Sequence, residues 1–245
     1  MAIGDLAGRV ALVTGGSGGI GRALVRRLAA AGADVAVAYG GDAAAAEESA
    51  AQARASGVRA IAAGADLADP GQVVALADRV AAECGPVDLL LANAGLSVPT
   101  PGLPELDLDT WQRTLAVNLT APFLLAQRLV PDMADRGFGR VLFTSSVAAF
   151  TGGLIGPHYA ASKAALHGLT AWLSARYAGS GVTVNALAPA LVADTGMLPA
   201  DADAGRIPVG RFGTADEVAE LALTMLGSGY LTGKVYLLDG GLYPH

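Results

Sequence analysis

The sequence predicts an α/β protein in which helices cover both faces of a doubly wound parallel sheet. Three observations support this prediction. Short apolar stretches alternate with stretches of helical periodicity along the chain. The apolar stretches are continuous rather than alternating with polar residues, as expected of strands buried on both faces. The 245 residues, 53% apolar and 16% charged, supply one large core and show no linker, so we expect a single domain over residues 1–245.

Seven apolar stretches are the candidate strands. They lie near residues 9–14, 34–38, 58–63, 88–92, 140–144, 182–188 and 234–238. In a doubly wound sheet with right-handed crossovers, ligands bind outside the carboxyl ends of the strands. Thr14, Asn93, Ser146 and Pro189 follow four of these stretches, so we expect the binding site at this edge of the sheet.

Several helix starts are marked by capping residues. Asp69 precedes a proline, which is typical of an N-cap followed by the first helical position. Thr214 and Glu217 have the spacing of a capping box. The alanine run at 43–46 is expected to begin a helix with Asp42 as its N-cap.

Charge and composition exclude several classes of function. The net charge is −6 and no cluster of lysine or arginine is present, which argues against nucleic acid or an anionic membrane as a partner. The only cysteine, Cys84, cannot form an intrachain disulfide, and we expect it to pack near a helix end rather than to act as a nucleophile. The N-terminus lacks a secretory signal pattern, so we expect a cytoplasmic protein.

One long uncharged stretch raises the question of a membrane span. Residues 141–162 contain no formal charge, which is long enough to cross a bilayer. Several glycines, Pro157 and His158 interrupt this stretch. A loop between a buried strand and a helix explains it better, and no membrane partner is expected.

A glycine cluster follows the first candidate strand. Residues 10–21 are Val-Ala-Leu-Val-Thr-Gly-Gly-Ser-Gly-Gly-Ile-Gly, and a stretch of helical periodicity comes next. Gly15, Gly19 and Gly21 allow a tight turn and a close approach of the backbone to a pyrophosphate, whose charge the helix N-terminus stabilises. The alternative is a glycine-rich turn without a ligand.

Tyr159 and Lys163 indicate a site of proton transfer. Their i, i+4 spacing places them on one face of a helix, and Ser146 lies thirteen residues before the tyrosine. A free tyrosine ionises near pH ~10, and a neighbouring ammonium lowers that pKa by stabilising the phenolate. The alternative is an ordinary pair on a helix surface.

Five motifs stand in one order along the chain. They are Thr14-Gly-x-x-x-Gly-x-Gly21, Asn93-Ala-Gly95, Asn118, Ser146 and Tyr159-x-x-x-Lys163. In these motifs and their spacing the sequence resembles the short-chain dehydrogenase/reductase family over nearly its whole length. Within that family it is most similar to the 3-oxoacyl-acyl-carrier-protein reductase group, through residues 210–213, the helix after them and residues 233–241. The resemblance implies a Rossmann-type fold and an oxidoreductase that transfers a hydride between NAD(P)(H) and a ketone or secondary alcohol.

The resemblance implies four catalytic residues. Tyr159 gives or takes a proton on the substrate oxygen, and Ser146 donates a hydrogen bond to the same atom. Lys163 lowers the tyrosine pKa and contacts the nicotinamide ribose. Asn118 holds a water that links the lysine to solvent, although a helix-capping or bend role is its alternative.

Two other candidates for chemistry are weaker. Ser145 and Thr144 are alternative hydroxyls, but the spacing to Tyr159 favours Ser146. A serine hydrolase built with His158 or His167 has no acid partner positioned by a motif, and we expect His167 to be a packing residue.

The cofactor-binding residues implied by the resemblance come from the ends of several strands. They are Gly15, Ser17, Gly18, Gly19, Ile20, Gly21, Tyr39, Asp66, Leu67, Asn93, Ala94, Gly95, Tyr159, Lys163, Pro189, Val192 and Thr195. Asp66 and Leu67 match an adenine-contacting pair, with a simple turn as the alternative for Asp66. No metal site is expected.

The second candidate strand bears on the choice between NAD and NADP. An acid at its end would bind the ribose of NAD, and here Tyr39 occupies about that position, so NADP(H) is favoured and NAD(H) is possible. Asp42, three residues on, is expected to be the helix cap. NADP-dependent relatives often carry arginine where this chain has Gly18. Arg22 either substitutes in part for that arginine or is a solvated residue in the first turn of the helix.

Substrate signals are mixed. The segment at about 190–210 is short, which predicts an open substrate cleft. It has Ala190 where relatives usually have glycine, and its Thr195 is shifted by one position.

The positions that dock an acyl carrier protein in the 3-oxoacyl-acyl-carrier-protein reductase group carry basic residues there. In this chain they are Gly137 and Ser180, and Arg136 is the nearest cation. We expect a 3-oxoacyl-thioester or general carbonyl reductase. The alternatives are an NAD-dependent alcohol dehydrogenase that acts oxidatively and a non-catalytic dinucleotide-sensing regulator.

The helix expected from His158 to about Ala178 is apolar on more than one face. Leu166, Leu169 and Trp172 contribute to this surface, which exceeds what one contact with the sheet can bury. We expect a homo-oligomer, and the resemblance implies a homotetramer.

Overall fold

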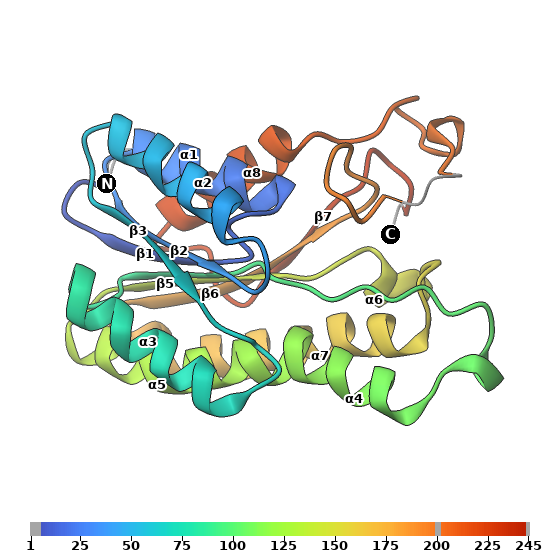
Figure 1. Ribbon diagram of the computed structural model, residues 1–245, viewed down its shortest axis with the longest axis horizontal. Helices are drawn as coiled ribbons and strands as arrows, with labels where there is room; N and C mark the ends of the chain where they lie inside the picture. Colours follow the sequence, from blue (N-terminus) through green and yellow to red (C-terminus); the bar gives the residue numbers. More distant parts are fainter. Residues whose placement is uncertain (1–5, 199–201, 244–245) are drawn as a thin grey trace.

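A seven-stranded parallel sheet forms the centre of the protein (Figure 1). The computed structural model describes residues 6–198 and 202–243. The strands are β1 Val10–Thr14, β2 Asp34–Tyr39, β3 Ala60–Gly64, β4 Leu89–Ala92, β5 Gly139–Thr144, β6 Val182–Pro189 and β7 Val235–Leu238, in the order β3-β2-β1-β4-β5-β6-β7. The order reverses between β1 and β4, which is where doubly wound sheets bind ligands. The predicted α/β fold is confirmed.

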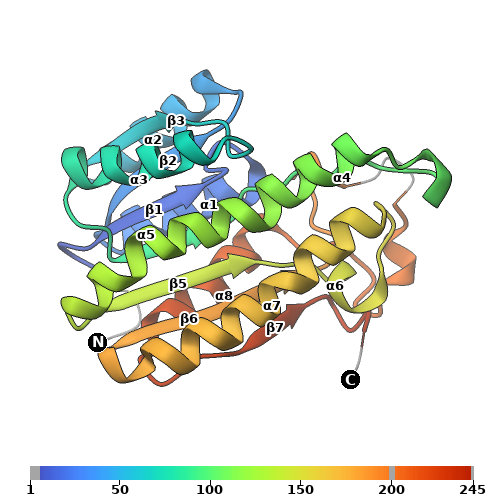
Figure 2. The ribbon, with the colours of Figure 1, turned by 90° about the horizontal axis from the view of Figure 1, so that it is seen from below.

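Helices cover the two faces of the sheet, as Figures 1 and 2 show. On one face lie α1 Gly19–Ala30, α2 Ala43–Ala55 and α8 Ala215–Gly227; on the other lie α3 Pro70–Cys84, α5 Ala121–Asp135 and α7 Pro157–Tyr177. The helix α4 Leu108–Leu115 continues into α5 through the π-helical turn η2 Ala116–Thr120. The short α6 Ala148–Thr151 lies near the start of α7 (Figure 2). Three single 3₁₀ turns are η1 Leu103–Glu105, η3 Ala178–Ser180 and η4 Ala204–Arg206.

The helix starts follow the predicted capping chemistry. Asp42 accepts a hydrogen bond from the Ala45 amide, and Asp69 accepts from two amides of the first turn of α3. Thr214 and Glu217 form the reciprocal bonds of a capping box. Side-chain oxygens thereby satisfy amides that a helix N-terminus leaves without partners.

Consecutive residues of the central strands are buried in two different cores. Leu90 packs on the α3, α5 and α7 side, whereas Leu89 and Leu91 pack on the α1 and α8 side. Successive side chains of a strand point to opposite faces, and both faces here are covered. This explains why the strand sequences are continuously apolar.

The uncharged stretch at 141–162 folds as predicted. It contains the end of β5, the short α6, a glycine-rich loop and the start of α7. Within the part of the chain that the structure describes, no helix has both the length and the apolar character needed to cross a membrane. The first five residues, on which the signal-peptide expectation partly rests, lie outside the described residues.

Candidate active site

A cavity of about 880 Å³ opens at the carboxyl ends of the strands. Its volume is in the range of sites that hold drug-sized ligands and cofactors. It begins where the loops after β1 and β4 meet. A Cβ atom on Gly15 would lie 2.9 Å from the Ala94 Cα, and Gly15 has a φ of +64°. Glycine is therefore required at this position for both space and backbone conformation.

The N-terminus of α1 faces this cavity without a side-chain cap. Gly18 is the N-cap and has no side chain that could accept a hydrogen bond from the amides of the first turn. That turn contains no acidic residue. A Cβ on Gly19 would lie 2.6 Å from the Asp194 carbonyl oxygen, and one on Gly21 would lie 2.0 Å from the Gly15 carbonyl oxygen. Uncapped amides at the positive end of a helix, reached by a close-packed glycine turn, fit the pyrophosphate of a dinucleotide.

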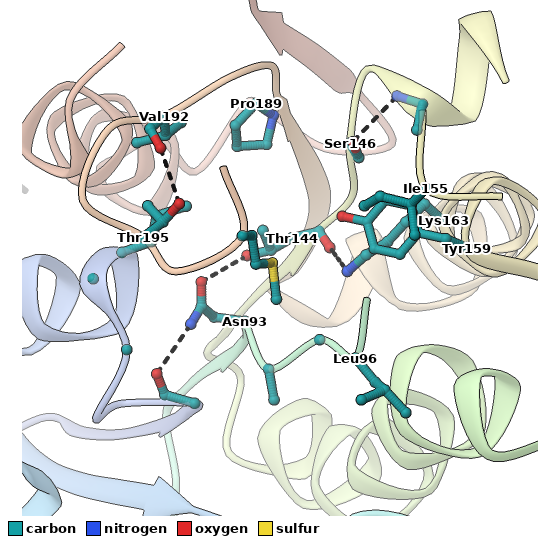
Figure 3. Close-up of a pocket in the computed structure, with 18 of the residues that line it drawn as sticks. Asn93, Leu96, Thr144, Ser146, Ile155, Tyr159, Lys163, Pro189, Val192 and Thr195 are labelled. Carbon is teal, nitrogen blue, oxygen red and sulfur yellow. Dashed lines mark hydrogen bonds between the residues drawn. The ribbon is translucent and has the colours of Figure 1, made fainter. Parts of the chain in front are cut away.

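Asn93 joins the ends of three strands. Its backbone amide and that of Ala94 both donate to the Thr14 hydroxyl at 3.0 Å, and its side-chain amide donates to the Thr14 carbonyl at 3.1 Å. The Thr144 hydroxyl donates to Asn93 Oδ1 at 3.4 Å (Figure 3). These bonds hold the ends of β1, β4 and β5 together beneath the cavity.

Tyr159 and Lys163 lie one turn apart on α7 and line the cavity with Ser146 (Figure 3). Tyr159 is 7% exposed and Lys163 is 3% exposed. The Lys163 ammonium donates to the Thr144 carbonyl at 2.7 Å and lies 5.7 Å from the centre of the Tyr159 ring. The structure thus places a phenol, an ammonium and a hydroxyl at one end of the cavity.

The pKa of Tyr159 differs from the expectation. Burial raises the pKa of the Tyr159 phenol, and the neighbouring Ser146 hydroxyl acts in the opposite direction. Burial also lowers the pKa of Lys163, to about 8. The pKa of Tyr159 is therefore raised where the sequence led us to expect a lowered value, because desolvation outweighs the effect of the nearby Lys163 ammonium, which donates to the Thr144 carbonyl. The phenol keeps its proton at neutral pH and is available as an acid.

The family follows from comparison with known sequences. The profile of the family described as short chain dehydrogenase matches residues 9–204. The chain belongs to this family. It is an oxidoreductase, and four of its five sequence motifs, all except Asn118, contribute residues to the wall of the cavity.

Individual short chain dehydrogenases are similar over nearly the whole chain. The cis-4-hydroxycyclohexanecarboxylate dehydrogenase of Sinomonas cyclohexanicum is 40% identical over 243 residues, covering 95% of this chain and 96% of the relative. The 3-oxoacyl-[acyl-carrier-protein] reductase of a Synechocystis species is 36% identical over 242 residues, covering 97% and 98%. A Burkholderia cenocepacia short chain dehydrogenase solved in complex with NADP has a TM-score of 0.89 at 40% identity, covering 97% of this chain and 98% of that one.

The residues predicted to bind the cofactor of this short chain dehydrogenase all line the cavity. They are Gly15, Ser17, Gly18, Gly19, Ile20, Gly21, Tyr39, Asp66, Leu67, Asn93, Ala94, Gly95, Tyr159, Lys163, Pro189, Val192 and Thr195. Thr195 donates to the Val192 carbonyl at 2.9 Å (Figure 3). Their binding roles stay predictions, since the geometry shows only that they surround one space.

Asn118 lies beside the cavity rather than in its wall. Its side chain is 1% exposed, accepts from the Leu96 amide at 2.7 Å, and donates to the Leu96 carbonyl and the Ser162 hydroxyl, both at 3.0 Å. Asn118 sits in η2 and fixes Leu96, which does line the cavity. These contacts fit the bend interpretation, and the water-holding role stays a prediction.

Ser145 and His167 form a contact that the sequence does not reveal. The Ser145 hydroxyl donates to the Lys163 carbonyl at 3.1 Å and lies 2.8 Å from His167 Nε2. The His167 ring also packs against the Phe150 ring, with 4.9 Å between the ring centres. The predicted packing role is therefore only part of what His167 does, since it also contacts Ser145. One turn beyond Lys163, His167 ties α7 to the end of β5. Ser146 is therefore the hydroxyl available beside Tyr159.

At the adenine end, several polar side chains are already engaged. Asp42 caps α2 as expected, and Arg22 donates to the Ser17 carbonyl and pairs with Glu48 at 3.4 Å, outside the cavity wall. The interpretation of Arg22 as a substitute phosphate ligand gains no support. Asp66 caps its own turn and pairs with Arg113 at 3.4 Å. Arg113 lines the cavity but was not predicted, because only the tertiary structure brings α4 next to the turn after β3.

The part of the cavity beyond the catalytic trio was also not predicted in detail. Its lining residues include Ala148, Leu154, Ile155, Leu191, Met197, Leu198, Asp203, Arg206 and Leu242. Most of them lie on loops after β5, β6 and β7, while Ala148 begins α6 and Arg206 ends η4. No periodic pattern in the sequence marks their inward-facing positions. Residues 199–201 of the predicted short substrate segment lie outside the described residues.

The buried lysine makes stability depend on pH. The pKa of Lys163 falls from its ordinary 10.5 to about 8 on folding, so above pH 8 the folded protein binds fewer protons than the unfolded chain. Stability due to this group therefore rises with pH, and from pH 7 to 10 we expect the wild type to gain on the order of 2 kcal/mol over Lys163→Met. The raised pKa of Tyr159 acts only above its ordinary 10.0.

Denaturant titrations at pH 7, 8, 9 and 10 measure this gain. Lys234 is exposed and does not line the cavity, so it provides the matched control. We expect Lys234→Met to follow the pH dependence of the wild type. If both variants follow it, Lys163 is not a titrating buried group in this window.

Proposed function

We propose that this short chain dehydrogenase interconverts a ketone and a secondary alcohol with NADP(H). The observation that supports this most is the meeting, in one cavity, of an uncapped helix N-terminus with the buried pair Tyr159 and Lys163 and the hydroxyl of Ser146. The first element fits a dinucleotide and the others fit a carbonyl oxygen. Relatives named as dehydrogenases and reductases of alcohol and carbonyl compounds support the same chemistry.

The proposed mechanism assigns each step at the substrate to residues of the chain. The glycine turn, the α1 amides and the segment from Asn93 to Gly95 would hold the dinucleotide, which supplies or accepts the hydride when bound. In reduction, the Tyr159 hydroxyl gives its proton to the substrate oxygen while Ser146 donates a hydrogen bond to that oxygen. Lys163 stabilises the resulting phenolate by its charge. In oxidation the proton returns to Tyr159 Oη.

NADP(H) is the favoured cofactor because no carboxylate guards the ribose position. Tyr39 ends β2 and lines the cavity, its hydroxyl 3.1 Å from where a Cβ on Gly64 would lie. Asp42 is committed to capping α2. The related Burkholderia protein binds NADP. NAD(H) stays possible, since the described cations near this end, Arg22 and Arg113, pair with carboxylates.

Tyr39→Asp tests the cofactor assignment. The carboxylate would repel a 2′-phosphate and accept hydrogen bonds from a free ribose, so kcat/KM with NADPH is expected to fall about tenfold to a hundredfold while that with NADH is kept. Tyr39→Phe, which adds no charge, is the control. The measurement follows absorbance of NADPH and NADH over a panel of cyclic ketones and a 3-oxoacyl thioester. Equal losses with both cofactors would contradict the assignment.

The substrate is better described as a general small ketone than as an acyl-carrier-protein thioester. Arg136, the cation nearest to the expected docking position, donates to Asp88 and to the Val87 carbonyl and is therefore already engaged by the segment before β4. Gly137 and Ser180 supply no charge. A 3-oxoacyl thioester that needs no carrier-protein dock is compatible with this arrangement. An alcohol dehydrogenase acting oxidatively is the runner-up, which the panel run with secondary alcohols and NAD⁺ would distinguish.

A non-catalytic dinucleotide sensor is the alternative from another class. The buried pair Tyr159 and Lys163 argues against it, because burying an ammonium costs free energy that a sensor would not need. Binding of NADPH without turnover on any ketone or alcohol of the panel would favour the sensor.

We also propose a cytoplasmic homotetramer. Three large apolar side chains are exposed on α4, α5 and α7, the helices in front in Figure 2: Leu108 at 65%, Phe123 at 42% and Trp172 at 60%. Exposed apolar residues on neighbouring helices support an interface between copies. Light scattering that gives only the 24.4 kDa mass of one chain would contradict it. The cytoplasmic assignment is supported by the single, buried Cys84.

A further inference from the structure

The substrate end of the cavity is mostly apolar. The carboxyl ends of β1, β2, β3 and β4 line the part of the cavity assigned to the dinucleotide. The part on the other side of Tyr159 is left for the substrate. Its wall contains Ala148, Leu154, Ile155, Leu191, Met197, Leu198 and Leu242. Such a wall suits a compact hydrocarbon frame around the reacting carbon.

Arg206 is the cation in this apolar wall. Of the described residues that line the cavity, three are cations, namely Arg113, Lys163 and Arg206. Arg113 pairs with Asp66 at the adenine end, and Lys163 belongs to the catalytic trio. Arg206 forms no ion pair with any residue in the described ranges 6–198 and 202–243. An anionic substrate group could therefore reach its guanidinium without breaking an existing ion pair.

The backbone that bears Arg206 is anchored. Asp203 caps the turn η4 by accepting from the Gly205 amide at 2.8 Å, and the Arg206 amide donates to the Asp203 carbonyl at 3.3 Å. The next residue, Ile207, is 3% exposed. Two residues further, the Val209 amide donates to the Gly240 carbonyl at 3.2 Å. The guanidinium is thus mounted on a fixed turn.

The same anchoring places Arg206 at the substrate end. Gly240 precedes Leu242, which lines the cavity, and the Tyr243 ring lies 5.9 Å from the ring of Phe150 in α6. Figure 1 shows this C-terminal segment and α6 beyond the carboxyl ends of the strands. The turn bearing Arg206 is therefore tied to the wall that follows Ser146 and not to the adenine end.

One acidic side chain lies on the same wall and must be weighed. Asp203 also lines the cavity, but its Oδ1 is engaged by the Gly205 amide as the cap of η4. Its charge reduces the local positive potential without removing the guanidinium donors. Arginine offers a planar fork of donors that matches a carboxylate with two hydrogen bonds.

We propose that Arg206 binds a carboxylate of the substrate, so that the substrate is a small cyclic or short-chain ketone or secondary alcohol bearing a carboxylate away from the reacting carbon. The assignment rests on the proposed oxidoreductase function of the same cavity. Ser146 and Tyr159 take the reacting oxygen, the apolar wall takes the carbon frame, and Arg206 fixes the far end. A substrate held at both ends is oriented for reaction, which a purely apolar pocket achieves less well.

The test compares two ketones of similar size, 4-oxocyclohexanecarboxylate and 4-methylcyclohexanone, in wild type and Arg206→Gln. With the acid, we expect kcat/KM to fall about tenfold to a hundredfold, mainly through KM, as loss of a charged hydrogen bond predicts. With the neutral ketone, kcat/KM should stay within about twofold. Arg206→Lys, which keeps the charge but not the fork, should lie between these limits.

Arg211→Gln is the matched control, because Arg211 lies on the same segment, pairs with Glu217 and does not line the cavity. It should leave both ketones unaffected. Equal losses on the two ketones in Arg206→Gln, or no loss on the acid, would overturn the anchor. NADPH affinity should be the same in all variants; a weaker NADPH complex in Arg206→Gln would reassign the arginine to the cofactor.

A binding measurement separates failure of the anchor from failure of the proposed function. Cyclohexanecarboxylate, which cannot react, is titrated into the protein with NADP⁺ by calorimetry. Wild type should bind it at least about tenfold more tightly than Arg206→Gln, whether or not any ketone is turned over. Equal affinities would reject the carboxylate anchor, whereas a weaker variant without turnover would reject only the enzymatic assignment.

Discussion

Replacing Tyr159 with phenylalanine is expected to lower kcat by about a hundredfold to ten-thousandfold, the usual contribution of a positioned general acid. The variant removes the Tyr159 hydroxyl from the wall of the cavity. Burial raises the pKa of this hydroxyl, so in the wild type it carries its proton at neutral pH and can act as the acid. The ring itself stays, so the packing around a side chain that is 7% exposed is little changed. NADPH affinity, measured by fluorescence titration, should be close to that of the wild type.

Tyr177→Phe is the control for this experiment. Tyr177 ends the same helix, packs against the core on the α7 side and does not line the cavity. It should keep full activity. A fully active Tyr159→Phe would remove the proposed proton donor and, with it, the mechanism.

Replacing Gly21 with alanine is expected to weaken NADPH binding by about a hundredfold or more, since overpacking against backbone costs up to several kcal/mol. The added Cβ would lie 2.0 Å from the Gly15 carbonyl oxygen and 2.8 Å from the Gly16 Cα. Both are backbone atoms, so no side-chain rotation relieves the contact. The glycine turn must move, and it is the part of the cavity that would hold the pyrophosphate.

Gly18→Ala is the matched control in the same turn. Its Cβ would lie 3.5 Å from the Gly15 carbonyl oxygen, an ordinary contact, and Gly18 has a φ of −82° that any residue adopts. Calorimetric titration with NADPH and a thermal melt should show near-normal binding and stability. If the two alanine variants bind NADPH alike, the turn does not form the phosphate site.

Much of the fold was predictable because its signals are local. A strand buried on both faces must be continuously apolar, and the residues of β1 and β4 show this without any knowledge of their neighbours. Asp42, Asp69 and the pair Thr214 and Glu217 cap helices through bonds that span at most three residues. The strand ends were placed within about two residues, the usual uncertainty where pairing decides the boundary.

Part of the site was predictable for a related reason. Parallel strands deliver their carboxyl ends to one edge, so motifs that follow strands must meet there whatever the details of packing. This argument brings Gly15, Asn93 and Ser146 together. The helical spacing of Tyr159 and Lys163 then adds their shared face.

The rest depends on desolvation and on contacts between distant segments. The burial of Tyr159 reverses the expected direction of its pKa, because the cost of charging a buried phenol outweighs the effect of a lysine that donates to Thr144. His167 meets Ser145 only because α7 packs on the end of β5.

The sequence by itself determined the order of strands and helices along the chain and the glycine turn, and it named Ser146, Tyr159 and Lys163 as the predicted proton-transfer trio, since each depends on local patterns and on fixed spacings along the chain. The tertiary structure alone decided which irregular segments close the substrate end, and so placed Arg206 in its wall. The physical reason is that loop side chains take their direction from long-range packing, such as that of Ile207 near Gly240, which no local period encodes.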